Sequence, residues 1–264
     1  MLGRPANDFA YFDAPFTALA HRGGITEHAP IEVENSLRGF RAAWEFGFTH
    51  LETDVHTTAD GVLVAFHDEV LDRVTDASGR LADLPWAEVQ GARIGGSEPI
   101  PRLDDLLDAL PAARFNIDLK SPSAVEPLAA TIERHGAQER VCVGSFHVAS
   151  ITAFRKRTGG RVATAASPTE VAVFSLLPGV RSRWPLAGQA FQMPERHPRT
   201  GLRLLTRGMV DAAHRRGAVV HVWTINDRPT MERLIDLGVD GIVSDDLATL
   251  KAVLVERDLW EGHA

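Results

Sequence analysis

The feature that most constrains the fold is a regular alternation of short apolar, β-branched runs with segments of helical periodicity. Eight such runs occur, and each is followed by a helical or helix-like segment. This alternation is typical of a parallel sheet covered by helices, and eight units predict a closed (β/α)8 TIM barrel. A doubly wound open sheet is the alternative. The predicted strands are 17–21, 50–55, 114–119, 141–145, 161–165, 187–191, 218–224 and 240–244.

The segments between these strands carry start and stop signals of α-helices. In NSLRGFRAAWEFG, apolar side chains recur at helical spacing, Asn35 or Ser36 can cap the start, and Gly47 ends the pattern. The fifth and sixth strands have the weakest pattern, and the segment between them is apolar nearly all round. The predicted helices include 35–47, 169–178, 205–217, 228–238 and 245–260.

Length and composition bear on domain organisation. A chain of 264 residues is long for one compact domain but usual for an α/β barrel. We find no linker, and we predict a single domain over residues 1–264 with a core of about 17–250. The longest irregular stretch, 68–101, is rich in Gly, Pro and Asp. We expect it to form a small, loop-rich insertion over one end of the barrel, after the second strand.

Charge and cysteine content exclude several classes of protein. A net charge of −7 argues against a generic nucleic-acid surface, because such surfaces need clustered lysines and arginines. The one cysteine, Cys142, lies between two valines and is predicted to be a core residue. The first 16 residues resemble no secretory signal, and no apolar run is long enough to span a bilayer. We expect a cytoplasmic protein; peripheral membrane contact and oligomeric state stay open.

Acidic side chains cluster in the second and third predicted strands. Glu52 and Asp54 are two residues apart, so they point to one face of a strand, and Asp118 and Lys120 share a face of the next. In a barrel, the C-terminal strand ends line the active site. Three carboxylates there need a cation, and hard oxygen ligands suit Mg²⁺ or Ca²⁺ better than Zn²⁺. The alternative is that these acids form a solvated face or a structural ion pair.

Two of the 11 histidines stand apart from the rest. His21 ends the first strand, in TALAHRGG. His67 follows a short apolar run, 62–66, which can return beside the second strand as a hairpin arm and bring the ring near the acidic cluster. Imidazoles that flank a metal can serve as base and acid, because their pKa lies near neutrality. For each ring, a purely structural role is the alternative.

Taken in order, these motifs resemble the glycerophosphodiester phosphodiesterase family, from about residue 17 to 250. Each motif is weak alone, but their joint order is specific. The matching segments are His21-Arg22-Gly23, Glu34-Asn35-Ser36, ETDVHTTADG at 52–61, His67-Asp68, Asp118-Leu119-Lys120, Trp223-Thr224-Ile225-Asn226 and DGIVSD at 240–245.

The resemblance implies a TIM-type barrel that hydrolyses glycerophosphodiesters to an alcohol and glycerol 3-phosphate, with one divalent cation, Mg²⁺ or Ca²⁺. The implied roles are ligands of the cation for Glu52, Asp54 and Asp118; an acid–base pair for His21 and His67; phosphate contacts for Arg22 and Lys120; a pocket wall for Trp223; and an orienting partner of the ligands for Glu34.

Two departures from the family pattern, and one pair of glycines, affect the residue roles that the resemblance implies. The family mostly has Glu where Asp118 stands, so the metal would lie closer to the third strand or be held through water. Ser36 replaces a threonine and keeps the hydroxyl, so we expect little change there. Gly23 and Gly24 let the backbone turn, and they would let a phosphate approach closely.

The sequence leaves three alternative functions open. A lysophospholipase D or sphingomyelinase D-like activity would need an apolar ledge for an acyl chain, which 68–101 or 174–180 would have to supply. A catalytically silent barrel that binds phosphodiesters ranks lower, because both histidines and all three carboxylates are present. An unrelated metal-dependent barrel hydrolase usually ends its first strand with His-x-His, whereas this chain has His-Arg-Gly. The sequence leaves open the head group, the metal and which histidine acts first.

Overall fold

The computed structural model describes residues 3–263 and contains a ring of parallel strands. These strands are β1 Thr17–Ile25, β2 His50–Thr57, β6 Arg114–Leu119, β7 Val141–Gly144, β8 Ala163–Thr164, β9 Ala190–Met193, β10 Val219–Val222 and β11 Gly241–Asp246. Their order in the sheet is β8-β7-β6-β2-β1-β11-β10-β9. A parallel bridge between Ala165 and Ala190 joins the two ends of this order. The barrel is therefore nearly closed, which confirms the predicted TIM fold against the open sheet.

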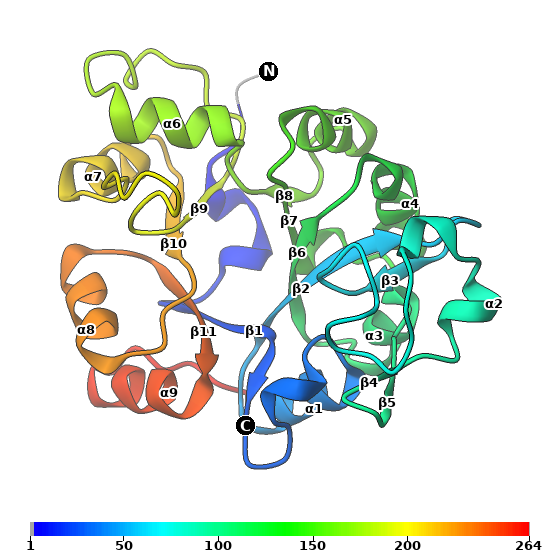
Figure 1. Cartoon of the computed structure of the whole chain (residues 1–264). Helices are drawn as coiled ribbons and strands as arrows, with labels where there is room; N and C mark the ends of the chain where they lie inside the picture. The colour runs from blue at the N-terminus through cyan, green and yellow to red at the C-terminus, as the bar shows by residue number, and fades with distance from the viewer. Residues whose placement is uncertain (1–2, 264) are drawn as a thin grey trace.

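Helices surround this ring on the outside (Figure 1). They are α1 Leu37–Glu45, α3 Leu103–Ala109, α4 Val125–Arg134, α5 Val148–Thr158, α6 Pro168–Leu176, α7 Arg207–His214, α8 Arg228–Leu237 and α9 Leu247–Glu256. At the start of α1, the side chain of Ser36 accepts a hydrogen bond from Gly39 N at 3.1 Å, so Ser36 rather than Asn35 is the cap. Each of the five predicted helices is confirmed.

Alternation along the strands separates an apolar outer layer from a more polar barrel interior. In β2, Leu51 and Val55 join the main hydrophobic core between strands and helices. Their neighbours in the strand point the opposite way, so Glu52 and Asp54 face the interior. Inside the barrel, Gln192 Nε2 donates to the side-chain oxygen of Asn116 at 2.6 Å. The strand period alone therefore turns the acidic side chains inward.

The N-terminal segment closes the end of the barrel where the strands begin. Two short 3-10 helices, η1 Ala6–Asp8 and η2 Ala10–Phe12, bring the fully buried Tyr11 against the interior. The Nε2–H of His50 donates to the Tyr11 carbonyl at 2.9 Å. Cys142 packs in the same small cluster as Phe9 and Tyr11, which confirms its prediction as a core residue. In Figure 1 this segment, in dark blue, crosses the middle of the ring.

The insertion after the second strand is more ordered than predicted. The hairpin arm β3 Leu63–Ala65 pairs antiparallel with β2, as expected. Beyond it the chain forms η4 Leu81–Asp83, α2 Trp86–Val89, β4 Arg93–Ile94 and β5 Glu98–Pro99. These elements share a separate hydrophobic cluster, which includes Phe66, Leu71, Leu81, Val89 and Ile94. The remaining 3-10 helices are η3 Ile31–Val33, η5 Pro122–Ala124 and η6 Gln138–Arg140.

Among residues 3–263, no helix combines the length and the apolar character that a bilayer crossing requires.

Candidate active site

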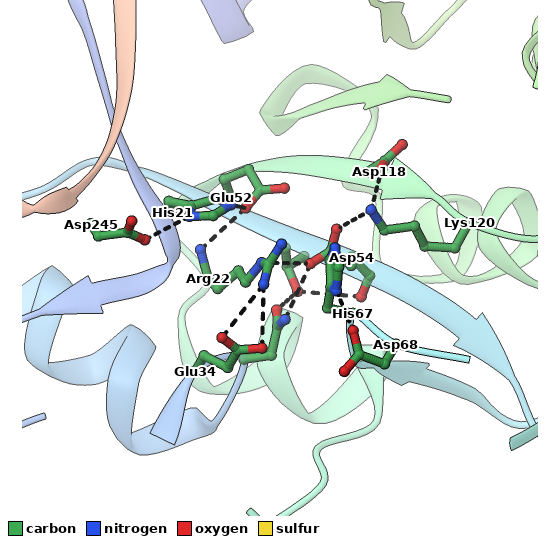
Figure 2. Close-up of polar contacts among 12 residues, drawn as sticks. His21, Arg22, Glu34, Glu52, Asp54, His67, Asp68, Asp118, Lys120 and Asp245 are labelled. Atoms are coloured by element: carbon green, nitrogen blue, oxygen red, sulfur yellow. Dashed lines mark hydrogen bonds and ion pairs between the residues drawn. The ribbon is translucent and has the colours of Figure 1, made fainter. Parts of the chain in front are cut away.

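The C-terminal end of β1 supplies the first two predicted site residues. His21 lies at the end of the barrel where the parallel strands terminate, which we call the mouth. Its Nδ1 is 2.6 Å from Asp245 Oδ1 (Figure 2). Because an ionised carboxylate can only accept, Nδ1 carries the hydrogen of this bond. The other ring nitrogen, Nε2, is 4.0 Å from Glu52 Oε2. At Arg22 the backbone turns into a left-handed conformation with φ of 52°, and the Arg22 N–H donates to Glu52 at 3.1 Å.

The acidic residues of β2 and β6 lie side by side, as the sequence predicts. Asp54 and Asp118 are register partners in the β2–β6 pair. Lys120 Nζ bridges them, at 2.8 Å from Asp54 Oδ1 and 2.7 Å from Asp118 Oδ2. Asp54 also accepts from the Asn35 side chain at 3.2 Å and lies 3.3 Å from Arg22 Nε. Asp54 therefore lies at the centre of the cluster, with a cation on each side.

Glu34 contacts cations rather than the three predicted ligands. Its carboxylate lies 3.3 Å from Arg22 Nη1 and 2.5 Å from Arg73 Nη2. Arg73 also reaches Asp68, so one guanidinium of the insertion holds two carboxylates of the site. Glu34 thus fixes the position of Arg22, and its predicted role as an orienting partner of the ligands stays a prediction.

The second histidine has a carboxylate partner of its own. His67 follows the hairpin arm, and its Nδ1 is 2.5 Å from Asp68 Oδ1. Its backbone carbonyl accepts from the buried His56 at 3.1 Å. The ring lies close enough to the cluster for the charges of Asp54, Lys120 and Arg22 to act on it. Figure 2 draws His67 with the acidic cluster, and its catalytic role stays a prediction. Each histidine uses Nδ1 for its carboxylate, which leaves Nε2 outside that bond.

Burial and crowding shift the protonation of the carboxylates. Burial, and then the neighbouring Asp54, raise the pKa of Glu52 to about 7. Burial also raises the pKa of Asp118. Burial would raise the pKa of Asp54 as well, but Lys120 and Arg22 outweigh it and hold that pKa below its ordinary value. Burial therefore disfavours the charged forms of Glu52 and Asp118, whereas Asp54 is kept charged by its two cations.

The two histidines shift in opposite directions. Burial alone would lower the pKa of His21, but the hydrogen bond to Asp245 and the charge of Glu52 outweigh it and raise this pKa. Burial lowers the pKa of His67, and the nearby cations add to that effect, although Asp54 and Asp68 oppose it. The two histidines therefore lie in different electrostatic environments, although both are at the same end of the barrel.

The donor set suits a hard divalent cation, but it is not assembled as a ligand cluster. Within residues 3–263, no three His, Cys, Asp or Glu side chains converge closely enough to hold a metal ion. The ammonium of Lys120 lies between Asp54 and Asp118 instead. Carboxylate oxygens are the donors that Mg²⁺ and Ca²⁺ prefer, and burial, followed by the charge of Asp54, raises the pKa of Glu52. The residues therefore fit such an ion by chemistry, once Lys120 moves aside.

An aromatic pair borders the charged cluster. Trp223 follows β10, and its ring packs edge-on against Phe146, with centroids 5.8 Å apart. Phe146 is 62% exposed, and Lys120 Nζ lies 5.8 Å from the centre of its ring. Phe146 thus lies between Trp223 and the charged residues, and no sequence motif points to it.

The two glycines after Arg22 serve packing. A Cβ on Gly23 would lie 2.9 Å from the backbone of Gly39 in α1, and one on Gly24 would lie 2.5 Å from Leu247 in α9. Both also have positive φ, which favours glycine. Their missing side chains face helices rather than the carboxylates, so the close approach of a phosphate expected at these positions is not supported.

Four charged or polar residues of the site received no role from the sequence. Three of them, Asp68, Asn226 and Asp245, lie within the motifs that match the family. The motifs mark these positions but do not show which side chains they contact. Arg73 lies in the insertion and carries no sequence signal at all. Asp245 and Asn226 come from β11 and from the chain after β10, far from His21 in sequence. Only the closed ring brings these strand ends together.

Comparison with known proteins identifies the family of this chain. A model of the glycerophosphoryl diester phosphodiesterase family matches residues 21–249. The chain is 37% identical over 256 residues to a Mycobacterium tuberculosis protein named probable glycerophosphodiester phosphodiesterase 2, covering 93% of both. It is 30% identical to a glycerophosphodiester phosphodiesterase of Caldanaerobacter subterraneus, covering 88% of this chain and 95% of the relative.

A solved structure extends the comparison to the fold. A phosphodiesterase from Oleispira antarctica, in complex with its product sn-glycerol-3-phosphate, superimposes with a TM-score of 0.75 at 22% identity, covering 93% of this chain and 99% of that one. The chain therefore belongs to the glycerophosphoryl diester phosphodiesterase family and is an enzyme of that class, which confirms the resemblance of its motifs.

Proposed function

We propose that this enzyme hydrolyses glycerophosphodiesters to an alcohol and glycerol 3-phosphate, with His21 and His67 as the acid–base pair. The observation that carries the proposal is the pair of imidazoles, each bonded through Nδ1 to a carboxylate, at the mouth that also holds Arg22 and Lys120. Both Nε2 atoms are then free of those carboxylates for proton transfer. Glycerol 3-phosphate is the product bound by the Oleispira relative.

The two cations retain capacity for a phosphate. A guanidinium has five N–H donors, and the contacts of Arg22 with Glu34 and Asp54 use only part of them. Lys120 uses two of its three donors on Asp54 and Asp118. Each side chain can therefore donate to a phosphate oxygen while it keeps one carboxylate partner. Such contacts stabilise the negative charge that grows on phosphorus oxygens in the transition state.

The substrate supplies a first nucleophile. A glycerophosphodiester has a free hydroxyl beside the ester oxygen, and intramolecular attack by that hydroxyl has a high effective molarity. One histidine would accept the hydroxyl proton and the other would protonate the departing alcohol. The resulting cyclic phosphate would then be opened by water, with the two roles reversed.

Glu52, Asp54 and Asp118 are the residues that would hold a divalent cation, Mg²⁺ or Ca²⁺. When bound, the ion would neutralise phosphate charge and act as a Lewis acid. Lys120 now pairs with two of these carboxylates, Asp54 and Asp118, so a bound ion would compete with its ammonium for them and would favour its contact with the phosphate. The shorter Asp118, in place of the family's usual Glu, keeps its carboxylate near the backbone of β6.

The test is hydrolysis of glycerophosphocholine with Mg²⁺ or Ca²⁺, with a chelator as the reference. His21→Ala and His67→Ala should each lower kcat by about 10²- to 10⁴-fold, the range of general acid–base catalysis. The matched control is His147→Ala, an exposed histidine after β7 at the same end of the barrel, which should keep wild-type turnover. Near-wild-type rates in either site variant would exclude the role assigned to that residue.

A lysophospholipase D or sphingomyelinase D-like activity is the alternative, and the position of residues 174–180 argues against them as its acyl-chain ledge. Leu176, Leu177 and Val180 are exposed, but they lie at and after the C-terminus of α6, which runs antiparallel to the strands. Arg216, just before β10, donates to the carbonyl of Trp184 at 2.9 Å, so this segment lies near the strand starts. Rates on glycerophosphocholine and on a lysophospholipid, measured side by side, decide between the two activities. A cytoplasmic location stays a prediction.

A further inference from the structure

Asp245 occupies a position in the site that neither histidine motif reveals. It lies near the end of β11, next to β1 in the barrel, and its Oδ1 accepts from His21 Nδ1 at 2.6 Å. The bond is short, and Asp245 is only 20% exposed in its side chain. Figure 2 shows this contact between the two side chains. A carboxylate at one ring nitrogen determines which nitrogen carries the hydrogen, because an ionised carboxylate can only accept.

Asp245 is itself held from the other side by Asn226. The Asn226 side-chain N–H donates to Asp245 Oδ2 at 2.8 Å, and Asn226 Oδ1 accepts from the Asp245 backbone N–H at 2.9 Å. Ser244 Oγ donates to the same amide oxygen at 3.0 Å. The amide is therefore fixed in orientation, and it presents an N–H to the carboxylate.

We propose that Asp245, anchored by Asn226, is the positioning residue that sets the tautomer and orientation of His21. This inference rests on the proposed function, because it assumes that His21 transfers a proton. The carboxylate holds the hydrogen at Nδ1, so the lone pair or the transferable proton is at Nε2, the atom that faces Glu52 and the mouth. Asp245 touches neither Glu52 nor the cations of the cluster in these contacts, so its effect passes through the imidazole.

An isosteric substitution isolates this effect. In Asp245→Asn one oxygen becomes an NH2 group, but both neighbours, His21 Nδ1–H and Asn226 Nδ2–H, are donors. The single remaining oxygen can satisfy only one of them. If it stays with Asn226, the NH2 faces His21 and drives the ring hydrogen to Nε2, which is the wrong tautomer for accepting a proton there.

The first measurement is steady-state kinetics on glycerophosphocholine. Asp245→Asn should lower kcat by roughly 10- to 100-fold, by analogy with the loss of a partner that orients a metal-bound histidine, and leave KM near the wild-type value. The matched control is Asp246→Asn, the next carboxylate of the chain, whose oxygens accept from Thr249 N and Oγ1 at the start of α9. This control should keep wild-type kcat.

The second measurement is a double-mutant cycle. In a His21→Ala background, Asp245→Asn should cause no further loss, because the imidazole through which it acts is gone. A loss that multiplies with that of His21→Ala contradicts the proposal. A wild-type kcat in Asp245→Asn, beside an inactive His21→Ala, also contradicts it and leaves the proposed function intact.

The third measurement does not depend on turnover. Long-range ¹H–¹⁵N NMR of the histidine rings reports which nitrogen of His21 carries the hydrogen. We expect Nδ1–H in the wild type and a shift toward Nε2–H in Asp245→Asn, with no change in Asp246→Asn. An unchanged His21 tautomer in Asp245→Asn overturns the proposal, even if the enzyme proves inactive on glycerophosphodiesters and the proposed function fails.

Discussion

The two ends of the barrel bury titratable side chains in opposite ways. At the mouth, His21, Glu52 and Asp54 lie among charged partners within hydrogen-bond or ion-pair distance. At the closed end, His50 forms hydrogen bonds with uncharged groups, the Tyr11 carbonyl through Nε2 and the Thr49 hydroxyl through Nδ1. His221 is fully buried and has no hydrogen-bond partner at Nε2 among the described residues. The pKa of His21 is raised, whereas burial lowers the pKa of His50 to about 4 and that of His221 to about 3.

The shifts of histidine pKa differ because the two ends of the barrel bury different kinds of neighbours. The mouth gathers buried charge, a usual cost of active sites in stability, and this charge suits the binding and proton transfer proposed for it. The closed end keeps its histidines neutral and packs them against Tyr11 and other side chains of the N-terminal segment. Substitutions at the mouth should therefore change activity more than stability, and substitutions at the closed end should do the reverse.

The largest expected effect is at the mouth, with Glu52→Gln. Loss of this predicted ligand should reduce activity by at least about 100-fold, the upper range for removing a partner of a metal ligand, and calorimetric titration should show weaker Mg²⁺ or Ca²⁺ binding. Because the pKa of Glu52 is raised to about 7, its charge costs stability above that pH.

At pH 8 with EDTA, the free energy of unfolding of Glu52→Gln should therefore exceed that of the wild type by roughly 1–3 kcal/mol. Denaturant titration measures this difference. A variant that is both inactive and less stable would mean that Glu52 has mainly a structural role.

At the closed end, Tyr11→Ala should give the largest loss of stability. Tyr11 is fully buried and packs against Phe12 and His50, with ring centroids 4.9 and 5.1 Å away. Truncation of a buried aromatic side chain typically costs about 3–5 kcal/mol. Thermal unfolding should show this loss, while kcat measured well below the unfolding temperature should stay near wild type. A strong loss of kcat in the folded variant would show that the two ends are coupled.

Acid stability should depend on His221. Its pKa is about 3 in the folded protein, against an ordinary value of 6.5, so the unfolded chain binds this proton first as the pH falls. The stability from keeping His221 neutral is complete above pH 6.5 and declines between pH 6.5 and 3. At pH 5 this group alone costs about 2 kcal/mol.

His221→Gln removes that titration and should make unfolding free energy less pH-dependent between pH 7.5 and 5. Denaturant titrations at several pH values measure the slope. If the slope equals that of the wild type, His221 is not protonated on unfolding in the expected way, and His50 or the carboxylates account for acid sensitivity.

The smallest effect on stability is expected at Phe146. The residue is 62% exposed, so Phe146→Ala should change the free energy of unfolding by no more than about 0.5 kcal/mol. The variant loses the edge contact with Trp223, and because Phe146 is mostly exposed, this contact should contribute only about 0.5 kcal/mol, the low end for aromatic pairs. If Trp223 walls the substrate pocket, KM for glycerophosphocholine should rise by about 2- to 10-fold. An unchanged KM would place the aromatic pair outside the binding site.

Much of the fold follows from the sequence for a simple reason. Strand and helix periodicities are local, so the predicted strands lie within a few residues of those observed, including the weak fifth and sixth ones. The insertion was harder, because its separate core combines residues such as Leu71 and Ile94 that show no regular spacing. The hairpin arm before His67 was predictable, since its short apolar run could only return beside β2.

The sequence by itself determined the eight-unit barrel, the family, and the residue types at the strand ends, because these depend on periodicity and on ordered motifs. Only the tertiary structure decided the partners of those residues. Asp245 meets His21, Arg73 joins Asp68 to Glu34, and Lys120 lies between Asp54 and Asp118. Most of these contacts join residues far apart in the chain, and their distances depend on how the ring closes, which no local pattern specifies.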